Sequence, residues 1–335
     1  MAAPDRDVAI LLTGVGKRYA LVSAFAQHAT TIAADPNPLA PAQYAAHHRR
    51  AVPLIDDPGY VPALRALCDE FGVGAVVPLT DLDLEVLGHA RDHPTHSLPA
   101  FVPDGDIARA TFDKYETHLL LQRLGLPSPP TVLPGEPVDR YPVMVKPRWG
   151  SGARSIHLAA DEREAEFLSA YIREPAMVQR AMGGPELSID CICDLEGRCL
   201  NAIPRTMLES RGGESIKGTV IADQELIDLG RRVVEALGCR GPCTVQVFRD
   251  PEIGLAITDV NTRFGGACPA HLYAALPGRT YPELIVRMAR GERIEPHVGE
   301  FRAGVTFSRY YWQLELDERL APTGTEAAVH RRPEP

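Results

Sequence analysis

A lysine followed by a glycine-containing turn is the strongest chemical signal in this sequence. Lys146 comes near the end of an apolar run that starts at Val143, and Gly150-Ser151-Gly152 follows it. A lysine at the end of a buried strand is costly unless an anion pairs with it. Glycines let backbone N–H groups come close to phosphate oxygens, because they have no Cβ. The pattern predicts a strand, a phosphate-binding glycine loop and a second strand.

Oxygen-bearing side chains in two short apolar runs form a second signal, about a hundred residues later. Gln246 lies within Thr244–Phe248, and Asp259 and Asn261 lie two apart in the next run. Residues two apart on a strand point to the same face of the sheet. Magnesium prefers near-octahedral oxygen ligands and usually keeps phosphates and waters among them. Together with the lysine, these residues predict a site for a metal–nucleotide complex.

The composition restricts the class of protein and its partners. Apolar residues make up 45% and charged residues 24% of 335 residues, which is ordinary for a soluble globular chain. This length predicts about two or three domains, or one large multi-lobed domain. A net charge of −9 argues against a nucleic acid or an anionic membrane as the main partner. We see no secretory signal and no bilayer-spanning stretch, so we expect a cytoplasmic location.

The N-terminal part has the pattern of a Rossmann-like unit. Val8–Leu12 predicts a strand, a glycine-containing loop and a helix-like run follow it, and Thr31–Ala34 predicts a second strand. Thr80 and Asp81 come directly after the strand-like run Ala75–Pro78. Ligands of open α/β sheets gather at such strand ends, so we predict that both residues contact substrate. A plain helix cap is the alternative for this pair.

Two nucleotide-binding motifs fail at this N-terminal loop. A phosphate-binding GxxxxGK[ST] loop would need glycine at Leu11 and a hydroxyl at Arg18. The dinucleotide fingerprint GxGxxG is broken at Tyr19, although Asp35 stands where a ribose ligand would be expected. The sequence therefore disfavours an NAD-binding enzyme, which we keep as a weaker alternative.

The second part of the chain alternates helices, strands and one polar segment. A helix is predicted from Asp113-Lys114 to Leu124, where a glycine and prolines end it. The further predicted elements are a helix at Glu162–Tyr171, a strand at Ala176–Arg180, a hairpin of Leu187–Cys193 with Cys199–Ile203, and a helix at Ile221–Leu237. Residues 205–217 are polar and contain glycines, so we predict a mobile loop there.

These motifs, in this order, resemble the ATP-grasp superfamily and, within it, the carbamoyl-phosphate-synthetase-like carboxylate–amine ligases. The resemblance covers roughly residues 8–310. It implies an α/β fold in which a Rossmann-like pre-ATP-grasp domain, residues 1–111, precedes an ATP-grasp domain of α+β type, residues 112–310. A lid subdomain is expected at about 142–185, and residues 311–335 are expected to form a C-terminal tail.

The resemblance also assigns nucleotide contacts. Lys114 and Lys146 match the two lysines that contact the phosphates, and the loop of Gly150, Ser151 and Gly152 matches the one that closes over them. The stretch that resembles the adenine hinge comprises Gln179, Arg180, Ala181 and Met182. Glu186 matches the position that binds the ribose hydroxyls. ATP is therefore the implied nucleotide.

The metal and substrate positions follow from the same resemblance. Gln246, Asp259 and Asn261 match the metal ligands, so Mg²⁺ is the expected ion, with Mn²⁺ as an alternative. One carboxylate and two amides leave less negative charge than two metal ions favour. Arg263 and Arg205 are the residues expected to neutralise the transferring phosphoryl group and the oxyanion. The expected substrate contacts are Lys217, Gly265 and Gly266, besides Thr80 and Asp81; Arg205 and Lys217 have solvated loop charges as their alternative interpretation.

The implied reaction joins a small carboxylate, for which an amino acid is expected, to an amine through an acyl phosphate. ADP and phosphate are the implied products. The alternatives are an ATP-grasp kinase that stops after phosphoryl transfer and a non-catalytic nucleotide-binding regulator. The expected partners are small-molecule acid and amine substrates, with no nucleic acid and no membrane, and a homodimer is kept as the quaternary alternative.

Overall fold

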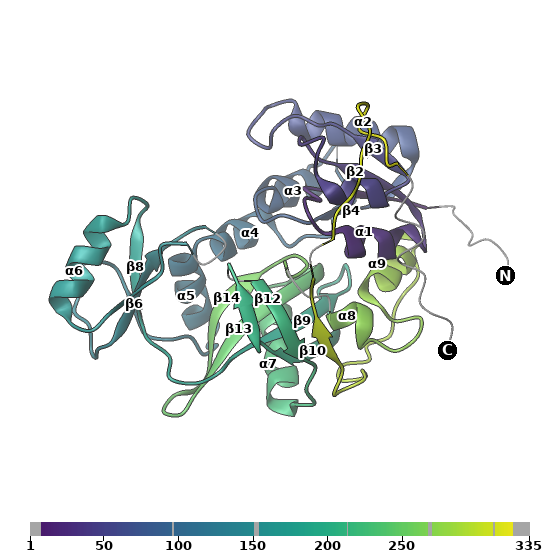
Figure 1. Ribbon diagram of the computed structural model, residues 1–335. Coiled ribbons are helices and arrows are strands. Elements are labelled where there is room, and N and C mark those ends of the chain that lie inside the picture. Colours follow the sequence, from purple (N-terminus) through teal and green to yellow (C-terminus); the bar gives the residue numbers. More distant parts are fainter. Residues whose placement is uncertain are drawn as a thin grey trace.

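The computed structural model describes residues 8–95, 97–150, 154–212, 214–266, 270–310 and 312–323, and these form four β-sheets (Figure 1). Ser151 and Gly152 of the predicted glycine loop lie outside the described residues. Strands of the three other sheets, and the loops that follow two strands of the N-terminal sheet, contribute side chains to the site described below. In the described part, no helix has both the length and the apolar composition that crossing a membrane requires.

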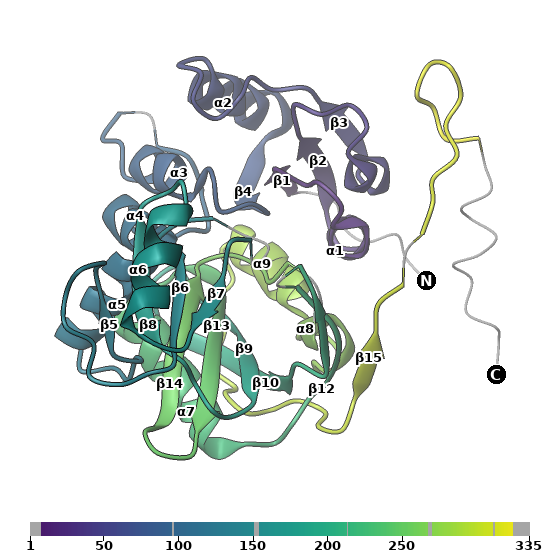
Figure 2. The same ribbon diagram turned by 60° about the vertical axis from the view of Figure 1, so that its left-hand side comes forward.

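The N-terminal sheet is parallel, with the order β3-β2-β1-β4. Its strands are β1 (Ala9–Thr13), β2 (Thr30–Ala34), β3 (His48–Arg50) and β4 (Val73–Pro78). Helix α1 (Tyr19–Ala26) packs on one face and α2 (Tyr60–Phe71) on the other, as Figure 2 shows. Because both faces are covered, every residue of β1 is buried. The predicted Rossmann-like unit is confirmed.

Two further helices, α3 (Leu84–Arg91) and α4 (Gly105–Phe112), lead from β4 to α5 (Lys114–Arg123). Asp113 caps α5, because its side chain accepts hydrogen bonds from the N–H groups of Tyr115 and Glu116. This cap begins the helix at Lys114, as the sequence predicts.

A smaller antiparallel sheet carries the lysine motif at one end of the molecule (Figure 1). Its order is β5-β8-β6-β7, formed by β5 (Thr131–Val132), β8 (Ala176–Arg180), β6 (Val143–Pro147) and β7 (His157–Ala159). Helix α6 (Glu162–Tyr171) packs against this sheet through Ala165, which lies in one apolar cluster with Val143, Val145 and Val178. The sequence predicts α6 and β8 with the observed limits.

The central sheet is antiparallel, with the order β10-β9-β13-β14. Its strands are β9 (Glu186–Cys193), β10 (Cys199–Thr206), β13 (Gly241–Asp250) and β14 (Gly254–Asn261). Alternate residues such as Leu187, Ile189 and Val245 pack against α7 (Gln224–Ala236) in one apolar cluster. The residues between them face the opposite side, which is the side of the site.

The segment predicted as a loop is largely strand. Arg205 belongs to β10, and β11 (Glu209–Arg211) and β12 (Glu214–Thr219) follow it. Strand β12 pairs with β15 (Thr306–Ser308), which is close to the end of the described chain. The loop prediction is therefore wrong, because β11 pairs with the adjacent β12, and β12 from Lys217 onward pairs with the distant β15. The remaining helices of the described residues are the short 3-10 helix η1 (Pro41–Ala45), α8 (Ala270–Tyr273) and α9 (Tyr281–Ala289).

Candidate active site

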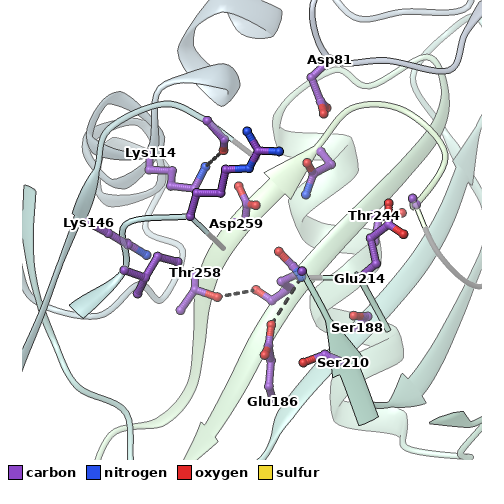
Figure 3. Close-up of a pocket in the computed structure, with 18 of the residues that line it drawn as sticks. Asp81, Lys114, Lys146, Glu186, Ser188, Ser210, Glu214, Thr244, Thr258 and Asp259 are labelled. Atoms are coloured by element: carbon purple, nitrogen blue, oxygen red, sulfur yellow. Dashed lines mark hydrogen bonds between the residues drawn. The ribbon is translucent and has the colours of Figure 1, made fainter. Parts of the chain in front are cut away.

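A cavity of about 1260 Å³ lies where the four sheets meet. Its lining comes from the loops after β1 and β4, from β6 and β7, from the polar face of the central sheet, and from β11 and β12. Figure 3 shows Lys114 and Lys146 on one side of Asp259, and Asp81, Thr244 and Glu214 on the other. The cavity therefore has two ends of different composition, with the metal-site candidates between them.

The central sheet aligns polar side chains through its register. Gln246 pairs with Ser188 on one side and with Asp259 on the other. The register shifts after Gln246, so that Val247 faces Ile257 and Thr258 is an extra residue. Such a bulge re-aims side chains locally. As a result the successive residues Thr258 and Asp259 both line the cavity.

Lys146 is buried at the end of β6, with 9% of its surface exposed. Its Nζ donates a hydrogen bond to Gln179 Oε1 at 2.9 Å, and Gln179 Nε2 donates to Thr131 Oγ1 at 2.9 Å. Burial, and after it the nearby Lys114, lower the pKa of Lys146 to about 8, although Asp259 and Glu186 act in the opposite direction. Lys114 Nζ donates to the carbonyl oxygen of Gly150 at 3.1 Å. Two converging ammonium groups make this end of the cavity suited to a polyanion.

Two acidic side chains near the lysines, Glu186 and Asp259, repel each other electrostatically. Glu186 Oε1 accepts a hydrogen bond from Gln246 Nε2 at 3.3 Å. Burial raises the pKa of Glu186, and the carboxylate of Asp259 raises it further. A cation bound by Asp259 would relieve this repulsion. The residues present therefore fit a divalent cation.

The same residues do not form a complete metal cage. In the described ranges, no group of three His, Cys, Asp or Glu residues is arranged to hold a metal ion. Asn261 Oδ1 already accepts a hydrogen bond from Arg263 Nη2 at 2.9 Å. A magnesium ion here would take its remaining ligands from phosphate oxygens and water, which is how proteins usually hold this ion. The site fits a magnesium–nucleotide complex better than a magnesium ion alone.

Two buried arginines keep an N–H group without a partner among the described residues. Arg205, with 3% of its surface exposed, donates from Nε to Asp190 Oδ2 at 3.1 Å, and its Nη1 is buried and unpaired. Arg263 donates from Nη2 to Asp81 Oδ2 at 2.7 Å, and its Nε is buried and unpaired. Each guanidinium is thus fixed by a carboxylate and retains a donor for an anion. Arg205 is held on a strand, contrary to its predicted place in a loop.

The structure brings most of the predicted site residues to this cavity. Besides those already described, the lining includes Thr80, Gly150, Arg180, Ala181, Met182, Gly265 and Gly266. Asp81 does not cap a helix, since α3 begins after Asp83. Lys217 is outside the lining; it is half-exposed on β12 and pairs with Glu209 at 2.5 Å.

Several lining residues were not predicted from the sequence. They are Lys17, Arg18, Ser188, Ser210, Glu214, Thr244 and Thr258. Ser188 and Thr244 could have been found, because each lies two residues from a predicted site residue on the same strand. Arg18 and Glu214 reach the cavity only through the packing of distant segments, and no local pattern marks them.

Two family models match different parts of the chain. Residues 10–97 match the model described as "PylC-like, N-terminal domain". Residues 173–310 match the model described as "ATP-grasp in the biosynthetic pathway with Ter operon". The second match contains the central sheet with Glu186, Gln246 and Asp259, and the first contains the parallel sheet.

Known proteins resemble the chain at low identity. The large chain of carbamoyl phosphate synthase from Agathobacter rectalis is 27% identical over 199 residues, which are 52% of this chain and 18% of that protein. The chain spans less than half the length of its carbamoyl phosphate synthase relatives.

Solved structures share the fold over most of the chain. An L-amino acid ligase from Bacillus licheniformis has a TM-score of 0.69 at 18% identity, covering 90% of this chain and 79% of that one. The biotin carboxylase domain dimer of 2-oxoglutarate carboxylase from Hydrogenobacter thermophilus, solved with MgADP and bicarbonate, has a TM-score of 0.68 at 18% identity. That match covers 89% of this chain and 73% of the other. At such identities the likeness is one of fold.

Proposed function

Because the chain belongs to the ATP-grasp superfamily, we propose that it uses ATP to join a small carboxylate, such as an amino acid, to an amine through an acyl phosphate. One observation carries the proposal: two lysines and the acidic pair Glu186 and Asp259 lie in the same cavity as two buried arginines that keep unpaired donors. The first group suits a magnesium–nucleotide complex, and the second suits an anionic substrate beside it.

The residues have distinct roles in this proposal. Bound MgATP would supply the transferable phosphoryl group. Lys114 and Lys146 hold the phosphate oxygens, and Asp259 with Gln246 orients the cation. Phosphoryl transfer depends mostly on positioning and charge neutralisation, so little covalent chemistry is required of the protein.

The two arginines act on the substrate side. Arg263, fixed by Asp81 and also hydrogen-bonded to Asn261, neutralises the phosphoryl group as the acid attacks it. Arg205, fixed by Asp190, stabilises the negative charge that develops when the amine attacks the acyl carbon. A donor that is already oriented loses no reorganisation energy at that step.

A matrix of acids and amines tests this proposal. Purified protein is incubated with ATP, magnesium and each pair, with bicarbonate among the acids, and ADP and phosphate release are measured. Release that requires both an acid and an amine supports the ligase. Release with a single substrate and a stable phosphorylated product identifies a kinase, and bicarbonate dependence identifies a carboxylase. The absence of ADP with every pair contradicts the proposal and favours a regulator.

Three accompanying predictions concern the whole protein. Magnesium is proposed as the ion, with manganese as a functional replacement. A homodimer is proposed, by analogy with the dimeric biotin carboxylase domain of similar fold, and sedimentation of the purified chain tests it. A cytoplasmic location stays a prediction from the sequence.

A further inference from the structure

Arg18 lines the cavity next to β1, the strand at which the strand order of the parallel sheet reverses. Strands β2 and β3 lie on one side of β1, and β4 lies on the other. Ligands of open α/β sheets bind in the crevice at such a switch point, beyond the carboxyl ends of the strands. The loop after β1 contains Arg18, and the loop after β4 contains Thr80 and Asp81; both loops line the cavity.

Close packing fixes these two loops together. Gly14 has a φ of +57°, and a Cβ placed on it would lie 2.5 Å from Thr80 Cγ2. Phe264, next to Arg263, packs against Phe25 of α1 with ring centroids 6.0 Å apart. Helix α1 begins directly after Arg18. These contacts hold the backbone around Arg18 close to the segment that carries Arg263, independently of any ligand.

The carboxylates at this end of the cavity form ion pairs with cationic side chains other than Arg18. Glu214 pairs with Lys17 at 2.9 Å and with Arg309 at 2.8 Å. Asp81 pairs with Arg263 at 2.7 Å. Within the described part of the chain, the Arg18 side chain makes no ion pair or hydrogen bond, and its Nε is shielded from solvent. Four cationic side chains thus face two carboxylates.

The environment of Arg18 is unfavourable to its charge. Burial, and after it the nearby Arg263, lower the pKa of Arg18 to about 10, while Asp81 and Glu214 act in the opposite direction. The guanidinium still carries its charge at neutral pH. A shielded cation beside a second cation is a site that a bound anion would stabilise.

We propose that Arg18 binds a substrate carboxylate that the reaction does not consume. This inference rests on the proposed ligase function and identifies the substrate class further. The carboxylate to be activated must lie near Lys146 and Asp259, where the phosphates are held. Figure 3 places Asp81 and Glu214, which act on Arg18, on the opposite side of Asp259 from Lys146. A different anionic group therefore occupies Arg18.

Two substrates could supply that group, and they share its chemistry. It is the α-carboxylate of an amino acid that serves as the amine, or the second carboxylate of a dicarboxylic acid that serves as the acid. Either substrate is anchored at Arg18 by a charge-assisted hydrogen bond. Replacing the carboxylate by an uncharged group should weaken binding at least about tenfold.

A binding experiment tests the site without requiring turnover. Isothermal calorimetry with ADP and magnesium present compares free α-amino acids with their α-amides, and dicarboxylic acids with monocarboxylic acids of equal length. The wild type should bind at least one charged series about tenfold more tightly. Arg18→Gln should remove this preference. Arg293→Gln, which makes the same charge change at a side chain 70% exposed on the surface, should retain it.

Each outcome decides the proposal. Equal binding of charged and uncharged series by the wild type, no binding of any charged compound, or an unchanged preference in Arg18→Gln would overturn it. The melting temperature of each variant without ligand shows whether loss of preference reflects loss of the fold. The series that shows the preference identifies which substrate supplies the carboxylate.

Failure of the proposed function gives a different pattern. The same compounds are assayed for ADP release with the wild type. If charged compounds bind through Arg18 but no pair releases ADP, the carboxylate site stands and the ligase reaction fails. If ADP is released equally with charged and uncharged compounds, the ligase stands and the role of Arg18 fails.

Discussion

Lys146 is the residue whose protonation should affect nucleotide binding most directly. Its burial and the nearby Lys114 disfavour the charged form. Its folded-state pKa of about 8 lies below the ordinary value of 10.5. Below pH 8 the folded protein carries a costly buried charge, and this cost is relieved as the pH rises from about 8 to 10.5. Phosphates stabilise the protonated form. ATP binding above pH 8 must therefore take up a proton.

This linkage predicts a pH dependence of affinity. ATP affinity should fall by up to about tenfold per pH unit above pH 8, because protonation of Lys146 is coupled to binding. Calorimetry between pH 7.5 and about 9.5 measures the change. In Lys146→Met the affinity should be weak and nearly independent of pH. Lys217→Met, outside the cavity lining, should behave as the wild type; a flat profile in the wild type would contradict the assignment.

Asp259 is the single carboxylate among the three predicted metal ligands. Asp259→Asn should lower turnover at least about a hundredfold, because the metal ion loses its charged ligand. The melting temperature should stay close to that of the wild type, since Asp259 has no hydrogen bond on which the fold depends among the described contacts. Steady-state kinetics over a range of magnesium concentrations measures the effect.

An exposed aspartate provides the control for this change. Asp228 on α7 is 49% exposed, and Asp228→Asn makes the same charge change away from the cavity. Its turnover should match the wild type. If Asp259→Asn keeps full turnover at limiting magnesium, Asp259 does not hold the metal ion.

The sequence predicts residues whose roles depend on local pattern. Lys146 with its glycine turn, and Asp259 with Asn261 at strand spacing, are predicted in this way. Thr258 could not be, because its place in the lining depends on a register shift between two strands. In the sequence, Arg18 stands out only as a residue that breaks a phosphate-loop motif. Its surroundings come from the loop after β4 and from Arg263, which are far from it in sequence.

At the scale of elements, α7 holds the central sheet in place. Its buried residues, among them Leu229 and Val233, pack in one cluster with Ile189 and Val245 of the sheet. The opposite face of these strands lines the cavity. A substitution in the apolar cluster between α7 and the central sheet should therefore lower the stability of the protein, and should lower catalysis only through that loss of stability.

Leu229→Ala should lower the free energy of unfolding by about 2–5 kcal/mol, because it removes most of a fully buried side chain and leaves a cavity in its place. Urea unfolding followed by circular dichroism measures this loss. Arg232→Ala, on the exposed face of the same helix, should change stability by less than about 0.5 kcal/mol. Equal effects of both substitutions would show that α7 does not pack as described.

Elements with strong local signals were predicted well, and those that depend on distant pairing were not. Helix α6 has a capping Asp161 whose side chain accepts from Glu164 N, and its limits follow from the sequence. Strands β11 and β12 are short, and charged and polar residues make up most of both. Strand β12 is ordered by pairing with β15, about ninety residues later. The sequence around β12 therefore does not contain β15, the strand with which it pairs.

At the scale of the whole molecule, one apolar cluster joins the parallel sheet to the central part. It contains Ile10 and Phe25 from the N-terminal part together with Ile203, Phe264 and Tyr281. This shared core fixes the loops after β1 and β4 over one end of the cavity. The proposed nucleotide end and the proposed substrate end are therefore built by different sheets on either side of Asp259 (Figure 3).

Transfer of oxygen from the acid to phosphate tests the central claim most directly. The acid that supports ADP release is prepared with ¹⁸O in its carboxylate, and the released phosphate is analysed by mass spectrometry. One labelled oxygen should appear in the phosphate, because the carboxylate oxygen that attacks the γ-phosphorus leaves with it when the amine attacks the acyl carbon. Label in AMP, or phosphate without label, would contradict the acyl-phosphate reaction at this site.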